Sequence, residues 1–135
     1  MPASYLLDTN IVSYLLRSEF PILRSRFETT GAAATAVSCI TEAEVFFGIA
    51  RKPGAARLRM AAAEFFASVP ALPWDSAAAR AYGSLRAEQE RKGRPLSTED
   101  LMIAAHAIAT GLILVTHDSV FSHVAGLKTD DWTIG

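Results

Sequence analysis

Four acidic side chains, spread over the whole sequence, are the residues best suited to chemistry on a phosphate group. Asp8 lies in YLLDTN, Glu44 in ITEAEVFFG, Asp100 in LSTEDLMIAAHA and Asp118 in LILVTHD. Each stands at or next to a predicted strand–helix junction, and open parallel α/β sheets gather such junctions at one ligand-binding edge. Carboxylates that converge there repel one another unless a divalent cation separates them, and Mg²⁺ or Mn²⁺ prefers oxygen ligands. The pattern predicts a metal-dependent enzyme acting on phosphate.

Each acid also has a purely structural interpretation. Asp8 precedes a predicted helix and is placed to cap it, and Asp118 follows a strand where a turn is expected. Glu44 and Asp100 each stand three residues after a threonine or serine, which is the spacing of a capping box. The placement of all four at one edge favours a shared site over four independent caps.

Two of the acidic segments contain a second candidate. Glu42 and Glu44 are two residues apart, and Glu99 and Asp100 are neighbours. Residues at these separations point in different directions from a helix, so one member of each pair is expected to reach the site. Spacing alone does not decide which one.

The elements that must position these acids alternate along the chain. β-Branched and apolar runs predict strands at 5–7, 35–40 and 112–116, with edge strands at 69–74 and 132–134. Capping residues, Pro and Gly delimit the predicted helices, which are 11–16, 21–30, a helix capped by Thr41 and ending before Pro53, 55–68, 76–92 and 98–110. Residues 92–96 are expected to form a loop. The alternation predicts a three-layer α/β/α sandwich around a mostly parallel sheet of four or five strands, in one domain over residues 1–135.

Composition narrows the function further. The 135 residues carry a net charge of −1, so nucleic acid would not be held mainly by bulk positive charge. Cys39 is the single cysteine, which excludes an internal disulfide and suits a reducing compartment. The sequence shows neither a leader peptide nor an apolar stretch long enough to span a bilayer, so we expect a cytoplasmic protein without a membrane partner.

Other chemistries find little support. His106 is far round its helix from Asp100 and is expected to have a surface or packing role rather than to bind a ligand, whereas His117, beside Asp118, is a candidate for substrate contact. The sequence has no phosphate-binding P-loop, no G-x-S-x-G turn and no zinc-ligand spacing. A dehalogenase-type phosphatase would have aspartate where Asn10 stands, and a receiver domain would have lysine at a late strand end, where Thr116 begins THD. The alternative that is not an enzyme is a binding module that has lost catalysis and keeps the acids for contact with a metal or a partner.

The motifs resemble those of PIN-domain nucleases, and specifically VapC-type toxins of prokaryotic toxin–antitoxin pairs. The similarity extends from LLDTNIVSYLLR through VSCITEAEVFFGIAR and KGRPLSTEDLMIAAHA to LILVTHD and GLKTDDW. It places the acids of the family on Asp8, Asp100 and Asp118, and on Glu44 rather than Glu42. It likewise selects Asp100 over Glu99.

The resemblance also implies roles for neighbouring side chains. Thr9, Asn10 and Thr116 match polar positions that support the acids, and Arg86 matches a basic position near the site that is a further candidate for substrate contact.

The activity that the resemblance implies is endonucleolytic cleavage of structured RNA, either tRNA or rRNA. One or two Mg²⁺ or Mn²⁺ ions among the four acids would activate a water molecule and offset charge in the transition state. The resemblance further implies a VapB-type antitoxin as partner, and a homodimer.

Overall fold

The computed structural model describes residues 3–94 and 96–135, so Pro95 of the predicted loop, and residues 1–2 of the predicted domain, lie outside the described residues. Within those residues the elements are β1 (Tyr5–Leu7), α1 (Thr9–Leu16), α2 (Pro21–Thr30), the 3₁₀ helix η1 (Ala32–Ala34), β2 (Thr35–Ser38), α3 (Cys39–Ala50), α4 (Ala56–Ser68), β3 (Ala71–Leu72), α5 (Ser76–Arg91), α6 (Thr98–Thr110), β4 (Ile113–Val115), the 3₁₀ helix η2 (Ser119–His123) and β5 (Thr129–Asp130).

The described strands form one parallel sheet in the order β3-β2-β1-β4-β5. The central strand β1 pairs with β2 on one side and with β4 on the other, with Leu7 opposite both Val37 and Val115. Parallel pairing brings the carboxyl ends of the strands to the same edge. The residues that follow β1 and β4 therefore start out side by side, which confirms the predicted parallel architecture.

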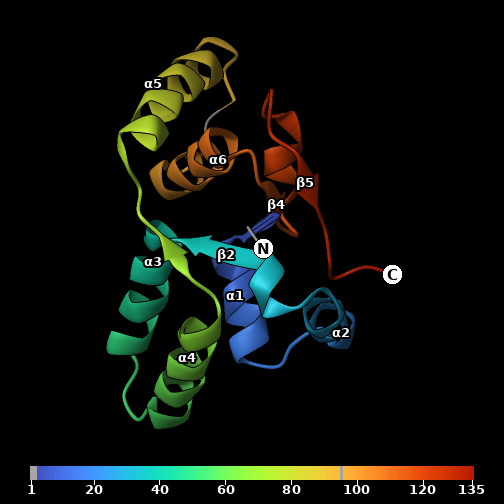
Figure 1. The fold of residues 1–135 in the computed structure, drawn as a ribbon. Helices are drawn as coiled ribbons and strands as arrows, with labels where there is room; N and C mark the ends of the chain where they lie inside the picture. Colours follow the sequence, from blue (N-terminus) through green and yellow to red (C-terminus); the bar gives the residue numbers. More distant parts are fainter. Residues whose placement is uncertain (1–2, 95) are drawn as a thin grey trace.

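Helices cover both faces of the sheet (Figure 1). On one face Leu7, Val37 and Val115 belong to a core built with α1, α2, α3 and α4. On the other face Leu6, Ala36 and Leu114 pack with α5, α6 and η2. Neighbouring residues of a strand point to opposite faces, so β1 and β4, which are apolar at every position, suit a sheet buried on both sides. The three-layer α/β/α sandwich predicted from the sequence is confirmed.

Side-chain caps fix the helix starts that matter for the site. Asp8 accepts a hydrogen bond from the Ile11 amide at the start of α1, and Ser97 accepts one from the Asp100 amide at the start of α6. The predicted start of α3 was wrong. Ser38 caps this helix, so 39–40 are helical rather than part of the second strand, and Thr41 is buried inside the helix instead of capping it.

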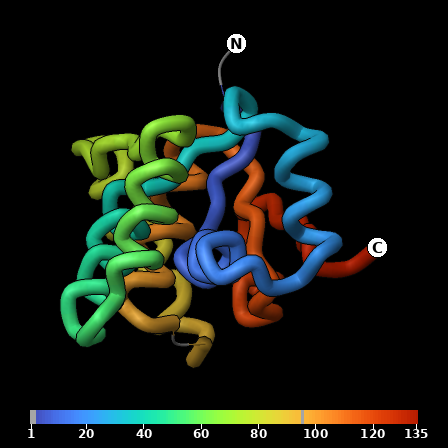
Figure 2. Tube along the Cα trace, turned by 90° about the horizontal axis from the view of Figure 1, so that it is seen from below, coloured from blue at the N-terminus to red at the C-terminus, as the bar shows by residue number. Residues whose placement is uncertain are grey.

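The predicted edge strand at 132–134 was also wrong, because the last strand is β5 at Thr129–Asp130. Trp132 follows it and is fully buried, with its indole Nε1 donating to the Asp130 carboxylate. The Arg26 guanidinium lies over the Trp132 ring, 5.5 Å from its centre. These contacts hold the C-terminal segment beside α2, as seen in Figure 2. Burial of the large Trp132 side chain, rather than strand pairing, therefore anchors residues 132–134.

The edge strand predicted at 69–74 is present as β3, shortened to Ala71–Leu72.

In the part of the chain that the structure describes, the helices are too short or too polar for any of them to cross a bilayer.

Candidate functional site

A pocket of about 210 Å³ opens at the carboxyl edge of the sheet. We call it the acidic pocket, and its lining residues are Asp8, Thr9, Asn10, Glu44, Ser97, Glu99, Asp100, Asp118 and Phe121. Its walls come from four separate parts of the chain. It therefore brings together all four carboxylates that the sequence singles out.

Each carboxylate reaches the pocket from a different element. Asp8 directly follows β1, and Asp118 lies beyond the end of β4, the neighbouring strand. Glu44 projects from α3 and Asp100 from the first turn of α6. Glu42, the alternative on α3, does not line the pocket. Glu99, the alternative on α6, lines it together with Asp100, so the expectation that one member of that pair reaches the site was wrong. Since α3 begins earlier than expected, Glu44 belongs to its second turn rather than its first.

Asp8 is the most buried of these acids, with 4% of its surface exposed. Burial raises the pKa of Asp8 from 3.8 to about 6, although hydrogen bonds from Thr116 and the Ile11 amide lower it in part. The negative charges of Asp100 and Asp118 raise it further. Asp8 is thus a carboxylate whose charged form is destabilised by its surroundings, which is the condition that a bound cation relieves.

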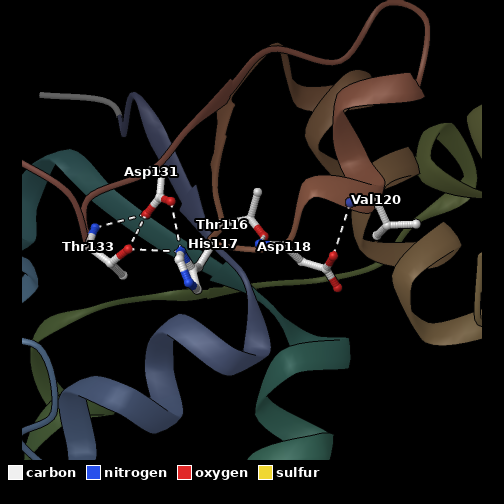
Figure 3. Close-up of polar contacts among 6 residues, drawn as sticks. All are labelled: Thr116, His117, Asp118, Val120, Asp131 and Thr133. Atoms are coloured by element: carbon white, nitrogen blue, oxygen red, sulfur yellow. Dashed lines mark hydrogen bonds and ion pairs between the residues drawn. The ribbon is translucent and has the colours of Figure 1, made fainter.

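Asp100 and Asp118 share this electrostatic environment. The pKa of Asp100 is raised by burial and by the charges of Asp118 and Glu99, against a hydrogen bond with Ser97. Asp118 is exposed and its Oδ1 accepts a hydrogen bond from the Val120 amide (Figure 3). One oxygen of Asp118 is therefore held by the start of η2, while the side chain still lines the acidic pocket.

Polar side chains accompany the acids at the pocket. The Thr116 hydroxyl accepts a hydrogen bond from the Asp118 amide and also bonds to the Asp8 carboxylate, so it links the ends of β1 and β4. The Thr9 hydroxyl donates to Thr41 on α3 over 3.2 Å. Asn10 lines the acidic pocket. Thr116 thus constrains Asp8 and the backbone of Asp118, whereas Thr9 ties α1 to α3.

The lining chemistry fits a hard divalent cation. Among the described residues that line the pocket, none is a lysine, arginine or histidine, so the carboxylates have no protein cation beside them. Nowhere in residues 3–94 and 96–135 do three or more acidic, histidine or cysteine side chains stand close enough to enclose an ion directly. Mg²⁺ keeps several of its waters and binds through one or two carboxylates. A partly hydrated ion therefore suits the width of this pocket.

Comparison with known proteins agrees with this geometry. The PIN-domain family matches residues 5–127. A tRNA(fMet)-specific endonuclease VapC from Shigella flexneri is 37% identical over 131 residues, which are 96% of this chain and 98% of that protein.

The chain belongs to the PIN-domain family, among the VapC ribonucleases.

Solved structures of VapBC show the same fold. The DNA-bound VapBC from Salmonella typhimurium superposes with a TM-score of 0.90 at 31% identity, covering 98% of this chain and 99% of that one. VapBC2 from Rickettsia felis, bound to a promoter fragment, gives 0.88 at 28% identity, covering 95% and 98%. PIN-domain nucleases generally use divalent metal ions, which is consistent with the oxygen-rich lining of the acidic pocket.

Two histidines of this PIN domain differ in their surroundings. His106 is buried, and its Nδ1 lies 2.8 Å from the Ser38 hydroxyl, so of the surface and packing roles expected for it the structure shows packing. His117 is exposed and faces a second pocket, lined by Asn10, Tyr14, His117, Asp118 and Ser119.

Arg86 does not reach the acidic pocket. Its guanidinium donates to the Glu90 carboxylate and the Tyr82 hydroxyl on the exposed face of α5. These bonds raise the pKa of Arg86, Glu90 contributing more than Tyr82. Arg86 could contact a substrate only if that substrate extended beyond the acidic pocket.

Sequence reasoning missed the residues that hold His117. Asp131 and Thr133, from the C-terminal segment, both bond to its ring (Figure 3). The available signal was the position of Asp131, because it lies just beyond a strand, as the other acids do. The wrongly predicted strand at 132–134 concealed it.

Proposed function

We propose that this protein is a divalent-metal-dependent endoribonuclease whose active site is the acidic pocket, with Asp8, Glu44, Asp100 and Asp118 as the metal-binding and catalytic acids. The proposal rests on one observation above all. The four carboxylates singled out from the sequence, together with Glu99, line a single pocket that contains no basic side chain among its described residues. A structural explanation by helix caps accounts for Asp8 and Asp118, which bond to local amides, but it leaves Glu44 without a role.

The acids differ in burial, and we propose different roles for them accordingly. Asp8 is fixed by its cap to α1 and by Thr116, so it offers a rigid oxygen at the back of the pocket. Glu44, Asp100, Asp118 and Asn10 line the same pocket. Mg²⁺ or Mn²⁺, as one or two ions, would supply the charge that activates a water and offsets the negative charge gathering on the phosphate. Thr116 would hold Asp8 and the Asp118 backbone in place, and Thr9 would tie α1 to α3, which carries Glu44.

For the substrate we propose a structured RNA, with tRNA the first class to test. The support is similarity to a relative named as a tRNA(fMet)-specific endonuclease, at 37% identity over nearly the whole chain. The alternative substrate class is rRNA, and the same cleavage assay tests it. Because readable bases of RNA lie in loops and single strands, cleavage is expected there rather than within a duplex.

We further propose that the protein acts in the cytoplasm as the toxin of a pair, bound by a VapB-type antitoxin. Its support is the similarity to VapBC complexes. The chain offers an apolar surface for such a partner, since Phe46 and Phe47 on α3 are 44% and 60% exposed. The homodimer implied by the resemblance stays a prediction, which light scattering after size-exclusion chromatography checks.

A paired substitution on α3 tests the assignment of the site. Purified protein is incubated with folded tRNA and Mn²⁺, and again with EDTA. We expect cleavage only with the metal, loss of cleavage in Glu44→Gln, and full activity in the matched control Glu42→Gln, which lies outside the pocket. Equal activity of the two variants would refute the role of Glu44, and cleavage in EDTA would refute metal dependence.

A further inference from the structure

Beside the acidic pocket lies a second pocket of about 310 Å³, which we call the His117 pocket. It is lined by Asn10, Tyr14, His117, Asp118 and Ser119, so it shares Asn10 and Asp118 with the acidic pocket. A polymer chain cleaved at the acidic pocket must pass on to neighbouring surface on either side. The His117 pocket is placed to receive a nucleotide next to the bond that is cut.

The ring of His117 is held firmly for an exposed side chain. Its Nδ1 lies 2.8 Å from Asp131 Oδ2 and 2.9 Å from the Thr133 hydroxyl oxygen. The Phe20 ring packs against it at a tilt of 53°, with centroids 5.7 Å apart, and Tyr14 meets Phe20 edge-on at 4.9 Å. Phe20 has a φ of +57°, which a large side chain rarely adopts and which the fold must stabilise. Such preorganisation is more than a solvated surface histidine requires.

These contacts determine which ring nitrogen carries the proton. The Thr133 hydroxyl gives its hydrogen to Asp131 Oδ1 over 2.6 Å, and the Thr133 amide donates to the same oxygen. Neither Asp131 Oδ2 nor the Thr133 oxygen then has a hydrogen to offer, so Nδ1 of His117 must be the donor. In the neutral imidazole Nε2 is therefore a hydrogen-bond acceptor.

Nε2 points away from this network. Figure 3 shows Asp131 and Thr133 together on one side of the ring, and Asp118 extending from the chain in a different direction from His117. Within the described residues, His117 makes its hydrogen bonds through Nδ1. The acceptor is thus available to a ligand in the His117 pocket.

The chemistry of RNA supplies a matching donor. Phosphate oxygens only accept hydrogen bonds, and the ribose 2′-hydroxyl is the one donor that the sugar–phosphate backbone presents at every nucleotide. We infer that His117 Nε2 accepts a hydrogen bond from the 2′-hydroxyl of a nucleotide flanking the scissile phosphate, so that the His117 pocket selects RNA over DNA. In this arrangement Asp131 is a positioning residue that sets the tautomer. The inference rests on the proposed ribonuclease function and specifies how its substrate is recognised.

Substrates modified at a single ribose test the contact. The two nucleotides that flank the cleaved phosphate are changed in turn to 2′-deoxy and to 2′-fluoro, which has no hydrogen to donate. At one of the two positions we expect wild type to lose about three- to tenfold in kcat/KM with either modification. His117→Phe should be slower on unmodified RNA but show no further loss. The matched control His123→Phe, whose histidine lines neither pocket, should retain the wild-type penalty.

Asp131→Asn provides a readout that a purely structural role would not alter. The carboxamide oxygen of this variant would keep both Thr133 donors, so its NH₂ group would face Nδ1 of His117 and turn Nε2 into a donor. We expect the penalty for 2′-fluoro to disappear in this variant. Binding of the same RNAs to Asp100→Asn in EDTA, followed by fluorescence anisotropy, should show the 2′-substituent effect without any cleavage.

The outcomes separate the two proposals. If wild type cleaves RNA but tolerates both modifications at both positions, or if His117→Phe retains the full penalty, the contact is wrong and the ribonuclease function stands. If wild type cleaves no RNA with Mn²⁺, the proposed function itself fails.

Discussion

Replacing Asp8 with asparagine should make the metal-free protein more stable while removing its activity. The pKa of Asp8 is raised from 3.8 to about 6, chiefly by burial. A shift of about two pKa units corresponds to about 3 kcal/mol of penalty for the charged form above pH 6. Asparagine has nearly the same shape, carries no charge and is an equally good helix N-cap, so the bond from the Ile11 amide is retained.

The sign of the pH dependence follows from proton binding. Between pH 4 and 6 the folded protein holds a proton on Asp8 that the unfolded chain has lost, so the folding free energy of wild type weakens as the pH rises through this range. Asp8→Asn does not titrate there. The stability difference between variant and wild type should therefore grow from near zero at pH 4 to about 3 kcal/mol at pH 7.5.

Urea unfolding in EDTA, followed by circular dichroism at several pH values, measures this difference. Mn²⁺ is then added, and at a concentration of 100 times its Kd it should stabilise wild type by about 2.7 kcal/mol and the variant far less. An Asp8→Asn protein that is no more stable than wild type at pH 7.5 in EDTA would refute the reasoning. A difference that does not vary with pH would refute it equally.

Three further outcomes are expected. Cleavage should fall as the pH drops through about 6, because Asp8, whose pKa is raised to about 6, then takes up a proton in competition with the ion, and the raised pKa of Asp100 acts in the same direction; a pH–rate profile at a fixed, subsaturating Mn²⁺ concentration measures this. Trp132→Ala should lower the free energy of unfolding by about 3–5 kcal/mol, with Trp132→Phe milder, because a fully buried side chain leaves a cavity; thermal unfolding checks it. Phe47→Asp should weaken antitoxin binding in calorimetry without changing RNA cleavage, because Phe47 is exposed and lines no part of the acidic pocket; unchanged affinity would exclude this surface.

Local signals determined the parts of the fold that could be predicted. The span of α6 follows from Ser97 at its start and Gly111 at its end, and the structure has both caps as expected. The start of α3 was missed because Ser38 and Thr41 are both good caps, three residues apart, and only tertiary contacts distinguish them. Thr41 is buried and bonds to Thr9, so it cannot serve as the cap.

The site residues also divide into those that the sequence predicts and those that depend on tertiary contacts. Asp8 directly follows β1, and Asp118 lies just beyond the adjacent strand β4. Parallel pairing of these strands therefore predicts that the two carboxylates lie near each other. The choice of Glu44 over Glu42 depended on family resemblance, since spacing on a helix left it open. The contact between His117 and Asp131 joins the segments that follow β4 and β5, and it depends on the path of the chain after β5, for which the sequence carries only weak local signals.

Direct measurement of Mn²⁺ binding tests the central claim, that the carboxylates of the acidic pocket form a divalent-cation site. Electron paramagnetic resonance of free Mn²⁺ during a titration gives the affinity of wild type, Asp8→Asn, Asp100→Asn and Glu42→Gln. We expect binding by wild type and Glu42→Gln, and at least a tenfold weaker Kd in Asp8→Asn and Asp100→Asn. Equal affinity in all four proteins would show that the ion does not bind among these acids.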